Sequence, residues 1–438
     1  MNAGKGVSGL SRSLAYVCDE RILREFRLAS CRARSVHCHL FFRVGLGMAM
    51  LGNALEGIRV LDLSRILAGP WCTQNLADLG AEVIKVERPN GGDDTRGWGP
   101  PYIESEDGAH KMSAYFSCCN RNKKSICLDF KLDSDKSKLL EMVRDADVLV
   151  ENYRVGTLMR HGLDYDSLKA INRGLIYLSI TGYGQTGPKA SKPGYDYIFQ
   201  GLGGLMSYTG RADDEEGAGP LRAGVAVVDI TTGMYATSAL LAALFQRQRT
   251  GEGAYLDIAL LDVALAMNAN QGANYLASGE NPRRTGNAHP NLAPYEVFRA
   301  QDSYFILAIG NDNQFQRFCA LCGRPGLAED ERFASNSARI SNLGSLRKIL
   351  AELIAQQPRR HWTRALDELG ISWGSVNTVE EAFADEQARH RGMLRHARHP
   401  VLGDVALVAN PMLAAEGQHR LSAPPLLGEH TNQILRVD

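Results

Sequence analysis

The stretch Ile58-Arg-Val-Leu-Asp-Leu63 has the composition of a buried β-strand, and it begins the part of the chain that decides the fold. A helix is expected over residues 72–79, ended by Gly80, and a second strand over Ala81-Glu-Val-Ile-Lys-Val-Glu87. Pro70 is placed for the first turn of that helix. The connecting turn lacks G-x-G-x-x-G, the dinucleotide fingerprint. It is either a generic turn or a helix start whose free amides hold a phosphate or carboxylate.

The same alternation continues along the chain. Further strands are expected to end near residues 130, 152, 180 and 260, with helices over 134–146 and from about Asp164. Strands alternating with helices at this spacing predict an α/β fold, in which a parallel sheet carries helices on both faces. A hairpin over 295–309, turning at Gln301-Asp302, and mostly helical sequence over 314–391 predict a smaller α+β domain.

Basic and amide side chains recur where the predicted strands end. They include Arg88 and the segments 120–124, 152–154 and 181–188. Ligands of parallel sheets bind at the carboxyl ends of the strands. Each basic group taken alone is equally well explained as solvated surface. Their recurrence at one edge favours an anionic ligand that carries several phosphates.

One acidic residue stands at the start of a predicted helix, in Gly224-Val-Ala-Val-Val-Asp-Ile-Thr-Thr-Gly-Met234. Apolar residues recur at helical spacing after Asp229, and the pattern stops at Gly251. Asp229 is therefore expected at the N-cap, where its carboxylate accepts hydrogen bonds from first-turn amides. The alternative is chemical: a helix N-terminus keeps a carboxylate ionised, and an ionised carboxylate can be a nucleophile.

Composition excludes several classes of function. Lys+Arg and Asp+Glu both number 49 in 438 residues, so no basic field for nucleic acid is present. Apolar runs such as 239–245 are shorter than the ~20 residues of a membrane span, which predicts a soluble globular protein. The nine cysteines and eleven histidines show no metal-ligand spacing, and the Cys319–Cys322 pair is expected on an amphipathic helix in a reducing compartment. We expect no metal, no nucleic acid and no membrane.

The chain divides into five predicted segments. Residues 1–52 are rich in Arg and poor in acids, which is typical either of a mitochondrial transit peptide or of an extension upstream of the true start. The protein is accordingly expected in the cytoplasm, or in the mitochondrial matrix if the first alternative holds. The remaining segments are a large domain with the parallel sheet over 53–250, linker helices over 251–285, a small α+β domain over 286–392, and a return to the large domain over 393–438.

Two motifs are rejected on their context. Gly370-Ile-Ser-Trp-Gly374 fits the G-x-S-x-G elbow of hydrolases, but a predicted helix precedes it and none follows at once. Gly182-Tyr-Gly-Gln-Thr-Gly-Pro-Lys189 is not a Walker A loop, because Pro188 intrudes and no Ser or Thr follows Lys189.

From Leu55 onward the chain resembles the family III CoA-transferases. The resemblance rests on ordered blocks: Val60–Ser64, Ala68–Pro70, Leu79–Arg88, Gly92–Arg96, Asn120–Ile126, Val150–Tyr153, Gly182–Gly184, Pro424–Thr431 and the Asp229 stretch. Within the family, residues 92–101 and 179–188 are most similar to members that move CoA between succinate and glutarate. Arg65 and Leu67 depart from the His and Gln of several relatives, and the glycine-rich loop of formyl-CoA transferases is not evident.

The resemblance implies an interlocked-ring homodimer, in which each chain has a Rossmann-like, CoA-binding large domain (residues 53–250) and a small domain. It also implies a set of site residues. The family's nucleophilic Asp falls on Asp229. Its CoA-contacting positions fall on Arg65, Ala68, Arg88, Leu128, Lys131, Asn152, Tyr153 and Arg160. Candidates for contacts to the substrate or to the oxyanion are Tyr195, Gly203, Gly204 and Arg222. CoA and acyl-CoA are substrates, and no permanently bound cofactor is expected.

The implied reaction passes CoA from an acyl-CoA, such as succinyl-CoA, to a carboxylic acid acceptor through an aspartyl-acyl anhydride and an aspartyl-CoA thioester. By residue type, Arg65, Arg222 or Arg284 is suited to hold the distal carboxylate of a dicarboxylate such as glutarate, and each is equally well explained as a surface group or a contact to a CoA phosphate. One alternative is an α-methylacyl-CoA racemase, which needs a base where Tyr195 stands. The other is a CoA-binding protein without activity.

Overall fold

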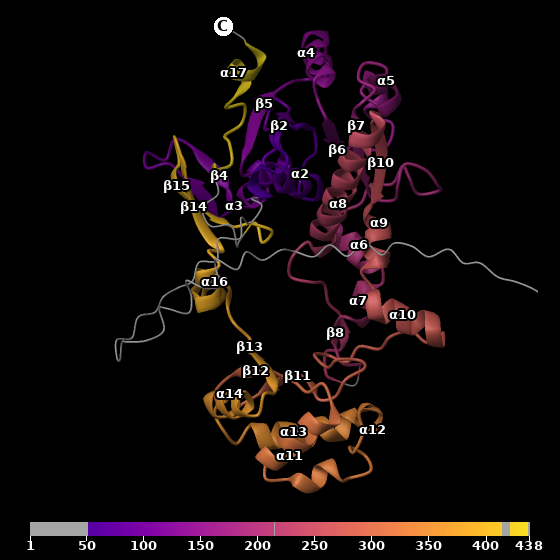
Figure 1. The fold of residues 1–438 in the computed structure, drawn as a ribbon, viewed down its shortest axis with the longest axis vertical. Helices are drawn as coiled ribbons and strands as arrows, with labels where there is room; N and C mark the ends of the chain where they lie inside the picture. Colours follow the sequence, from indigo (N-terminus) through magenta and orange to yellow (C-terminus); the bar gives the residue numbers. More distant parts are fainter. Residues whose placement is uncertain (1–50, 214, 414–420, 437–438) are drawn as a thin grey trace, which may run out of the picture. The chain divides into compact units, whose positions relative to one another are not determined.

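The fold is given by a computed structural model, which describes residues 51–213, 215–413 and 421–436 (Figure 1). The predicted extension over residues 1–52 lies outside this range, apart from Leu51 and Gly52 at the start of a short 3₁₀ helix, η1 Leu51–Asn53.

Six parallel strands form the main sheet. Their order is β10 Ala254–Ala259, β7 Ile176–Thr181, β6 Val148–Glu151, β1 Arg59–Asp62, β2 Glu82–Glu87 and β5 Lys123–Cys127. All five neighbouring pairs are parallel. Counted along the chain from the β5 edge, the order is 3-2-1-4-5-6, which is the Rossmann order. The predicted α/β fold with a parallel sheet is confirmed, and its strand order reverses between β1 and β6.

Successive residues of each strand enter opposite cores, because side chains alternate across a sheet. Val60 and Val148 belong to a core that includes Leu76 of α2 Ala68–Asp78 and Leu240 of α8 Val227–Thr250. Leu61 and Leu149 face a second core with α4 Asp133–Arg144 and α5 Tyr165–Lys169. Both faces are covered, which fits the mainly apolar sequences of the central strands β6 and β7.

Helix α8 is the longest element. Within the described residues it is the single helix long and apolar enough to cross a membrane by length and composition. Its side chains Leu240 and Leu244 are buried in the first core, as in the core helix of a globular protein. Short helices pack near it: α6 Asp196–Leu202, α7 Leu205–Tyr208, α9 Leu260–Ala266 and α10 Ala269–Ser278.

A second sheet is antiparallel and has its own core. Strands β11 Tyr295–Arg299 and β12 Tyr304–Ala308 form the predicted hairpin, and β13 Ser372–Ser375 pairs with β12. Aromatic side chains fill the core between this sheet and α11 Asp312–Leu321, α12 Asn336–Ser341, α13 Leu343–Ile354 and α14 Arg359–Glu368. Cys319 is a buried free thiol of α11, as predicted. Ser372 begins a strand and stands at no strand-to-helix elbow.

The last part of the described chain makes a small hairpin and then reaches the main sheet. Helices α15 Val379–Ala384 and α16 Glu386–His390 precede β14 Leu394–His399 and β15 Gly403–Val408, which pair with each other. The strands β14 and β15 share a core with β4 Lys111–Ser113 and α3 Ala114–Ser117. Strand β4 pairs with β3 Tyr102–Glu104. The hydroxyl of Thr431, in α17 Thr431–Leu435, accepts from the Cys127 amide of β5 (3.1 Å).

Candidate active site

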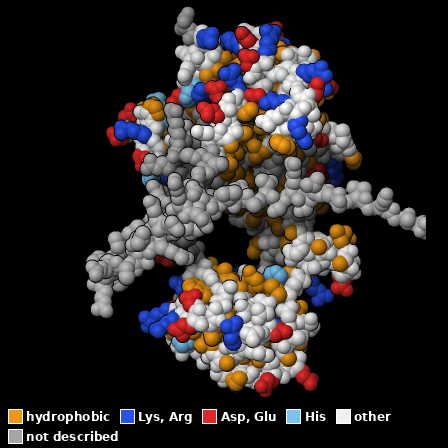
Figure 2. Space-filling model, in the orientation of Figure 1, with side chains coloured by type: hydrophobic (Ala, Val, Ile, Leu, Met, Phe, Trp, Pro, Cys, Tyr) orange, Lys and Arg blue, Asp and Glu red, His pale blue; other side chains and the backbone are white. Residues whose placement is uncertain are grey.

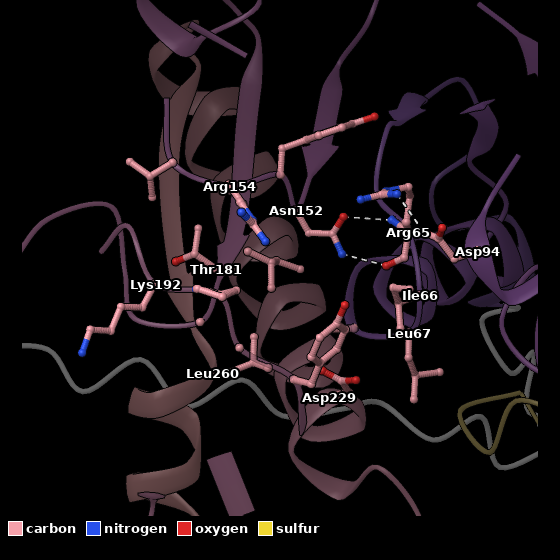
Figure 3. A pocket seen from close by; sticks show the side chains of 18 of the residues that line it. Arg65, Ile66, Leu67, Asp94, Asn152, Arg154, Thr181, Lys192, Asp229 and Leu260 are labelled. Carbon is pink, nitrogen blue, oxygen red and sulfur yellow. Dashed lines mark hydrogen bonds and ion pairs between the residues drawn. The ribbon is translucent and has the colours of Figure 1, made fainter. Parts of the chain in front are cut away.

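A pocket of about 460 Å³ opens at the carboxyl ends of the parallel strands (Figure 3). It is lined by residues 65–68 after β1, 152–155 after β6, 180–182 and 190–195 at and after β7, and Leu260 after β10, together with Asp94, Trp98 and Asp229. The pocket lies where the strand order reverses, the place at which sheets of this topology bind ligands.

Two hydrogen bonds join the turns at this reversal point. The Arg65 amide donates to Asn152 Oδ1 (2.9 Å), and Asn152 Nδ2 donates to the Arg65 carbonyl (2.7 Å), as Figure 3 shows. The next residue, Ile66, has φ 73°, a left-handed conformation that is strained for a β-branched side chain. Its amide is held by the Asp93 carboxylate (3.2 Å). The strain is therefore maintained at the pocket wall by defined contacts.

A group of buried charges, which we call the floor of the pocket, holds the loops that contribute Arg65 and Asp94 to the pocket lining. Lys85 Nζ donates to the Ser64 carbonyl (2.8 Å) and pairs with Asp93 (2.9 Å), while Lys123 pairs with Asp62 (3.0 Å). Burial alone raises the pKa of Asp62, but Lys123 and Lys85 lower it to about 2. Every charge in this group has an opposite charge or a hydrogen-bond partner, as buried charges require. The two loops that carry Ser64 and Asp93 are thereby tied to the sheet.

Asp229 occupies the third position of α8 and is not its N-cap. The N-cap residue is Ala226, and the amides of Val228 and Asp229 donate to Asp196 Oδ1 (2.7 and 3.1 Å). The cap prediction is wrong because another helix supplies the capping carboxylate. Within the described residues, the Asp229 carboxylate accepts no hydrogen bond.

The pKa of Asp229 also differs from the expectation. Burial and the neighbouring Asp196 carboxylate raise the pKa of Asp229 to about 7. The start of a helix was expected to keep this group ionised, but its first-turn amides are occupied by Asp196. Loss of water and a like charge then dominate.

Four of the eight predicted CoA-contacting residues line the pocket: Arg65, Ala68, Asn152 and Tyr153. Arg65 donates to Asp94 (2.7 Å), and its guanidinium lies over the Tyr153 ring, 5.5 Å from the centroid.

The other four lie outside the pocket lining. Arg88 binds the opposite oxygen of Asp94 (2.7 Å) and so adjoins the wall. Leu128 is buried in the second core, Lys131 lies in the loop before α4, and Arg160 is exposed in η3 Met159–His161.

Of the predicted substrate and oxyanion residues, some line the pocket and others lie outside it. Tyr195 lines the pocket and is 63% exposed. The Gly203 and Gly204 amides already donate to the carbonyls of Phe199 (2.8 Å) and Gly201 (3.2 Å), so neither is free for an oxyanion. Arg222 donates to the Ala223 carbonyl and lines a different pocket, and Arg284 pairs with Asp213. Of the three predicted arginine clamps, the structure places Arg65 alone at the pocket.

The sequence of residues 55–431 matches the family model described as CoA-transferase family III. The chain belongs to this family. The succinate–glutarate CoA-transferase of Agrobacterium fabrum is 47% identical over 87% of this chain and 94% of its own length. The succinyl-CoA:glutarate CoA-transferase of Homo sapiens is 40% identical over 87% of this chain and 85% of its own. A solved CAIB/BAIF family protein from Brucella suis is 46% identical over 87% of this chain and 98% of its own, with a TM-score of 0.78.

This CoA-transferase has pocket residues to which the sequence assigned no role. The Arg154 guanidinium has no partner among the described residues, and Figure 3 shows it directed toward the space between Asn152 and Thr181. The sequence indicated Arg154 only as part of the segment 152–154, one of the groups of basic and amide residues where the predicted strands end. Lys192 also lines the pocket, but its ammonium points away from Asp229. An unpaired carboxylate and an unpaired guanidinium in one cavity suit a reaction that binds one carboxylate and uses another as nucleophile.

Proposed function

We propose that this CoA-transferase moves CoA from succinyl-CoA to a dicarboxylic acid such as glutarate, with Asp229 as the nucleophile. The observation that carries the proposal is the unpaired carboxylate of Asp229 in the pocket at the strand ends. The substrate pair is supported by the names of the relatives from Agrobacterium fabrum and Homo sapiens.

The proposed reaction proceeds through covalent intermediates on Asp229. Asp229 attacks the thioester carbonyl of succinyl-CoA, which forms a mixed anhydride and expels CoA thiolate. The thiolate attacks the aspartyl carbonyl of the anhydride, so succinate leaves and an aspartyl-CoA thioester remains. The acceptor carboxylate attacks that thioester and forms a second anhydride. CoA thiolate then attacks its acyl carbonyl, which regenerates Asp229 and releases the new acyl-CoA.

CoA is proposed to lie along the edge that carries β1, β2, β5 and β6. Arg65, Arg88, Lys131 and Arg160 follow these four strands and are suited to phosphates, while Ala68, Leu128, Asn152 and Tyr153 would contact the rest of the molecule. Arg65 and Arg88 both bind Asp94. A bound phosphate would therefore compete with Asp94 for these guanidinium groups.

Arg154 takes the role that was expected of Arg65, Arg222 or Arg284. Its guanidinium is directed into the pocket and has no protein partner among the described residues. A guanidinium binds a carboxylate through two parallel hydrogen bonds, which suits the distal carboxylate of a dicarboxylic acid.

A homodimer is proposed as the working form. Figure 2 shows hydrophobic side chains gathered over α8, where Met234, Tyr235 and Phe245 are 41%, 50% and 62% exposed. Contiguous exposed apolar surface of this kind marks a protein interface. A second copy of the chain is the partner that the family resemblance implies.

Isotope exchange tests the function. Wild-type enzyme is expected to transfer label from free succinate into succinyl-CoA, and to form glutaryl-CoA faster than the CoA ester of any monocarboxylic acid of similar length. The Asp229→Ala variant should bind CoA but catalyse neither reaction. Retained turnover in that variant, or a preference for monocarboxylic acids in the wild type, would contradict the proposal.

A further inference from the structure

Asp196 belongs to α6 but accepts hydrogen bonds from the start of α8, the helix that carries Asp229. It is the first residue of α6 and is only 8% exposed. Its Oδ1 accepts from the amides of Val228 and Asp229, and its Oδ2 accepts from Gln200 Nε2 (2.6 Å). Three N–H donors stabilise its negative charge at the start of α8.

Gln200 extends this contact to the segment before α8. Its side chain is fully buried, and its Oε1 accepts from the Ala223 amide (2.9 Å). Asp196 and Gln200 together hold the backbone at residue 223 and at residues 228–229. The direction in which the Asp229 side chain leaves the helix is set by these bonds.

We propose that Asp196 is the positioning residue of the CoA transfer: it caps α8 from α6, so that the Asp229 carboxylate faces the pocket unpaired and beside a second negative charge. This inference rests on the proposed nucleophilic role of Asp229. The two carboxylates differ in their surroundings, since Asp196 holds all three donors and Asp229 holds none. Neighbouring carboxylates whose surroundings differ in this way take different roles.

The neighbouring charge changes the reactivity of Asp229. Burial and Asp196 raise the pKa of Asp229. Once ionised, a more basic carboxylate is a stronger nucleophile. Tyr115 of α3 is a further titratable neighbour, and burial and Asp229 raise the pKa of its phenol, so it remains neutral. Arg65, Asp94, Arg154, Lys192 and Tyr195 line the same pocket, and Asp262 lies in the first turn of α9.

Two variants of Asp196 separate its charge from its position. Asp196→Asn keeps an oxygen for the two amides and removes the charge. It is expected to move the midpoint of the acid limb of kcat/KM down by about one pH unit, and to lower the plateau rate about tenfold with KM for succinyl-CoA unchanged. Asp196→Glu keeps the charge but misplaces it, and is expected to lower kcat without moving the midpoint. The matched control is Asp164→Asn, which likewise removes the charge of a capping carboxylate, at the start of α5, and keeps an oxygen for the Ser167 amide; it should leave both quantities unchanged.

The outcomes are distinct. An unshifted midpoint in Asp196→Asn, or a full rate in Asp196→Glu, overturns the inference, and the second measurement decides if the Asn variant does not fold. Failure of the proposed function is recognised separately, because the wild type would then show no exchange that depends on Asp229.

Discussion

Asp62 and Asp229 are two carboxylates beside one pocket, and their surroundings are opposite. Asp62, at the end of β1, accepts from Lys123, Thr73 and Ser64, and Lys123 and Lys85 lower its pKa to about 2 despite its burial. Asp229 accepts from no described residue, and burial and Asp196 raise its pKa to about 7. The fully paired carboxylate fixes the floor of the site. The unpaired one is left for chemistry.

The largest expected effect is on turnover. Asp229→Asn removes the nucleophile and preserves its shape, so CoA transfer should fall by about 10³-fold or more. The check is the initial rate of glutaryl-CoA formation, with circular dichroism to verify the fold. Asp62→Asn is the comparison, because it should act through stability and leave the nucleophile in place. Equal rates in Asp229→Asn and the wild type would remove Asp229 from the mechanism.

The second largest effect is expected on the free energy of unfolding, when a buried charge of the pocket floor is removed. Lys85→Met leaves Asp93 and Asp62 buried without that cation, which should cost about 3–5 kcal/mol in the free energy of unfolding. Urea unfolding measures it. Lys124→Met is the matched control, because the side chains of Lys124 and Glu82 are 39% and 36% exposed, and a pair that water reaches is worth about 1 kcal/mol or less. A similar loss in both variants would show that the buried network has no special role.

The third effect is the pH dependence of stability. Because the folded-state pKa of Asp229 lies above its ordinary value of 3.8, the folded protein holds an extra proton between about pH 4 and 7. This contribution is fully present below pH 3.8 and is lost as pH rises through about 7. The loss is at most about 4 kcal/mol. Asp229→Asn should therefore be more stable than the wild type at about pH 8 and gain little at about pH 4. Thermal unfolding of the variant and the wild type at both pH values measures this. An equal stability difference at the two pH values would contradict the raised pKa of Asp229.

The smallest effect concerns the choice of acid. Arg154→Gln should slow transfer to glutarate about tenfold more than transfer to a monocarboxylic acid, because the guanidinium pairs with the distal carboxylate. Lys192→Gln, from the same pocket, is the control and should change both acids equally. The measurement is the ratio of kcat/KM for the two acceptors. An unchanged ratio in Arg154→Gln would assign Arg154 to CoA or to structure.

Local periodicity was sufficient to predict the sheet, because short apolar runs such as Val148-Leu-Val150 alternate with helical sequence. It missed β13, whose Ser-Trp-Gly-Ser sequence lacks apolar alternation. The cap assigned to Asp229 was wrong for a related reason: the capping carboxylate comes from Asp196, thirty-three residues earlier in the chain. The amides of Gly203 and Gly204 are occupied by bonds at the end of α6, which residue type does not indicate.

The site was predicted by resemblance more than by spacing. Arg65, Ala68, Asn152, Tyr153, Tyr195 and Asp229 are brought together in one pocket. The roles of Arg88, Leu128, Lys131 and Arg160 stay predictions, because contacts to CoA depend on a molecule whose position no chain segment dictates. Arg154 follows Tyr153 directly, yet its lack of a partner is a property of the folded chain.

The central claim is that Asp229 forms the covalent link, and oxygen transfer tests it most directly. During turnover with glutarate labelled with heavy oxygen in its carboxylates, the second anhydride is cleaved at the acyl carbonyl, so one glutarate oxygen stays on Asp229. Mass spectrometry of the digested enzyme should find the label in the peptide that contains Asp229, and only after succinyl-CoA is added. Turnover without label in that peptide would contradict the account.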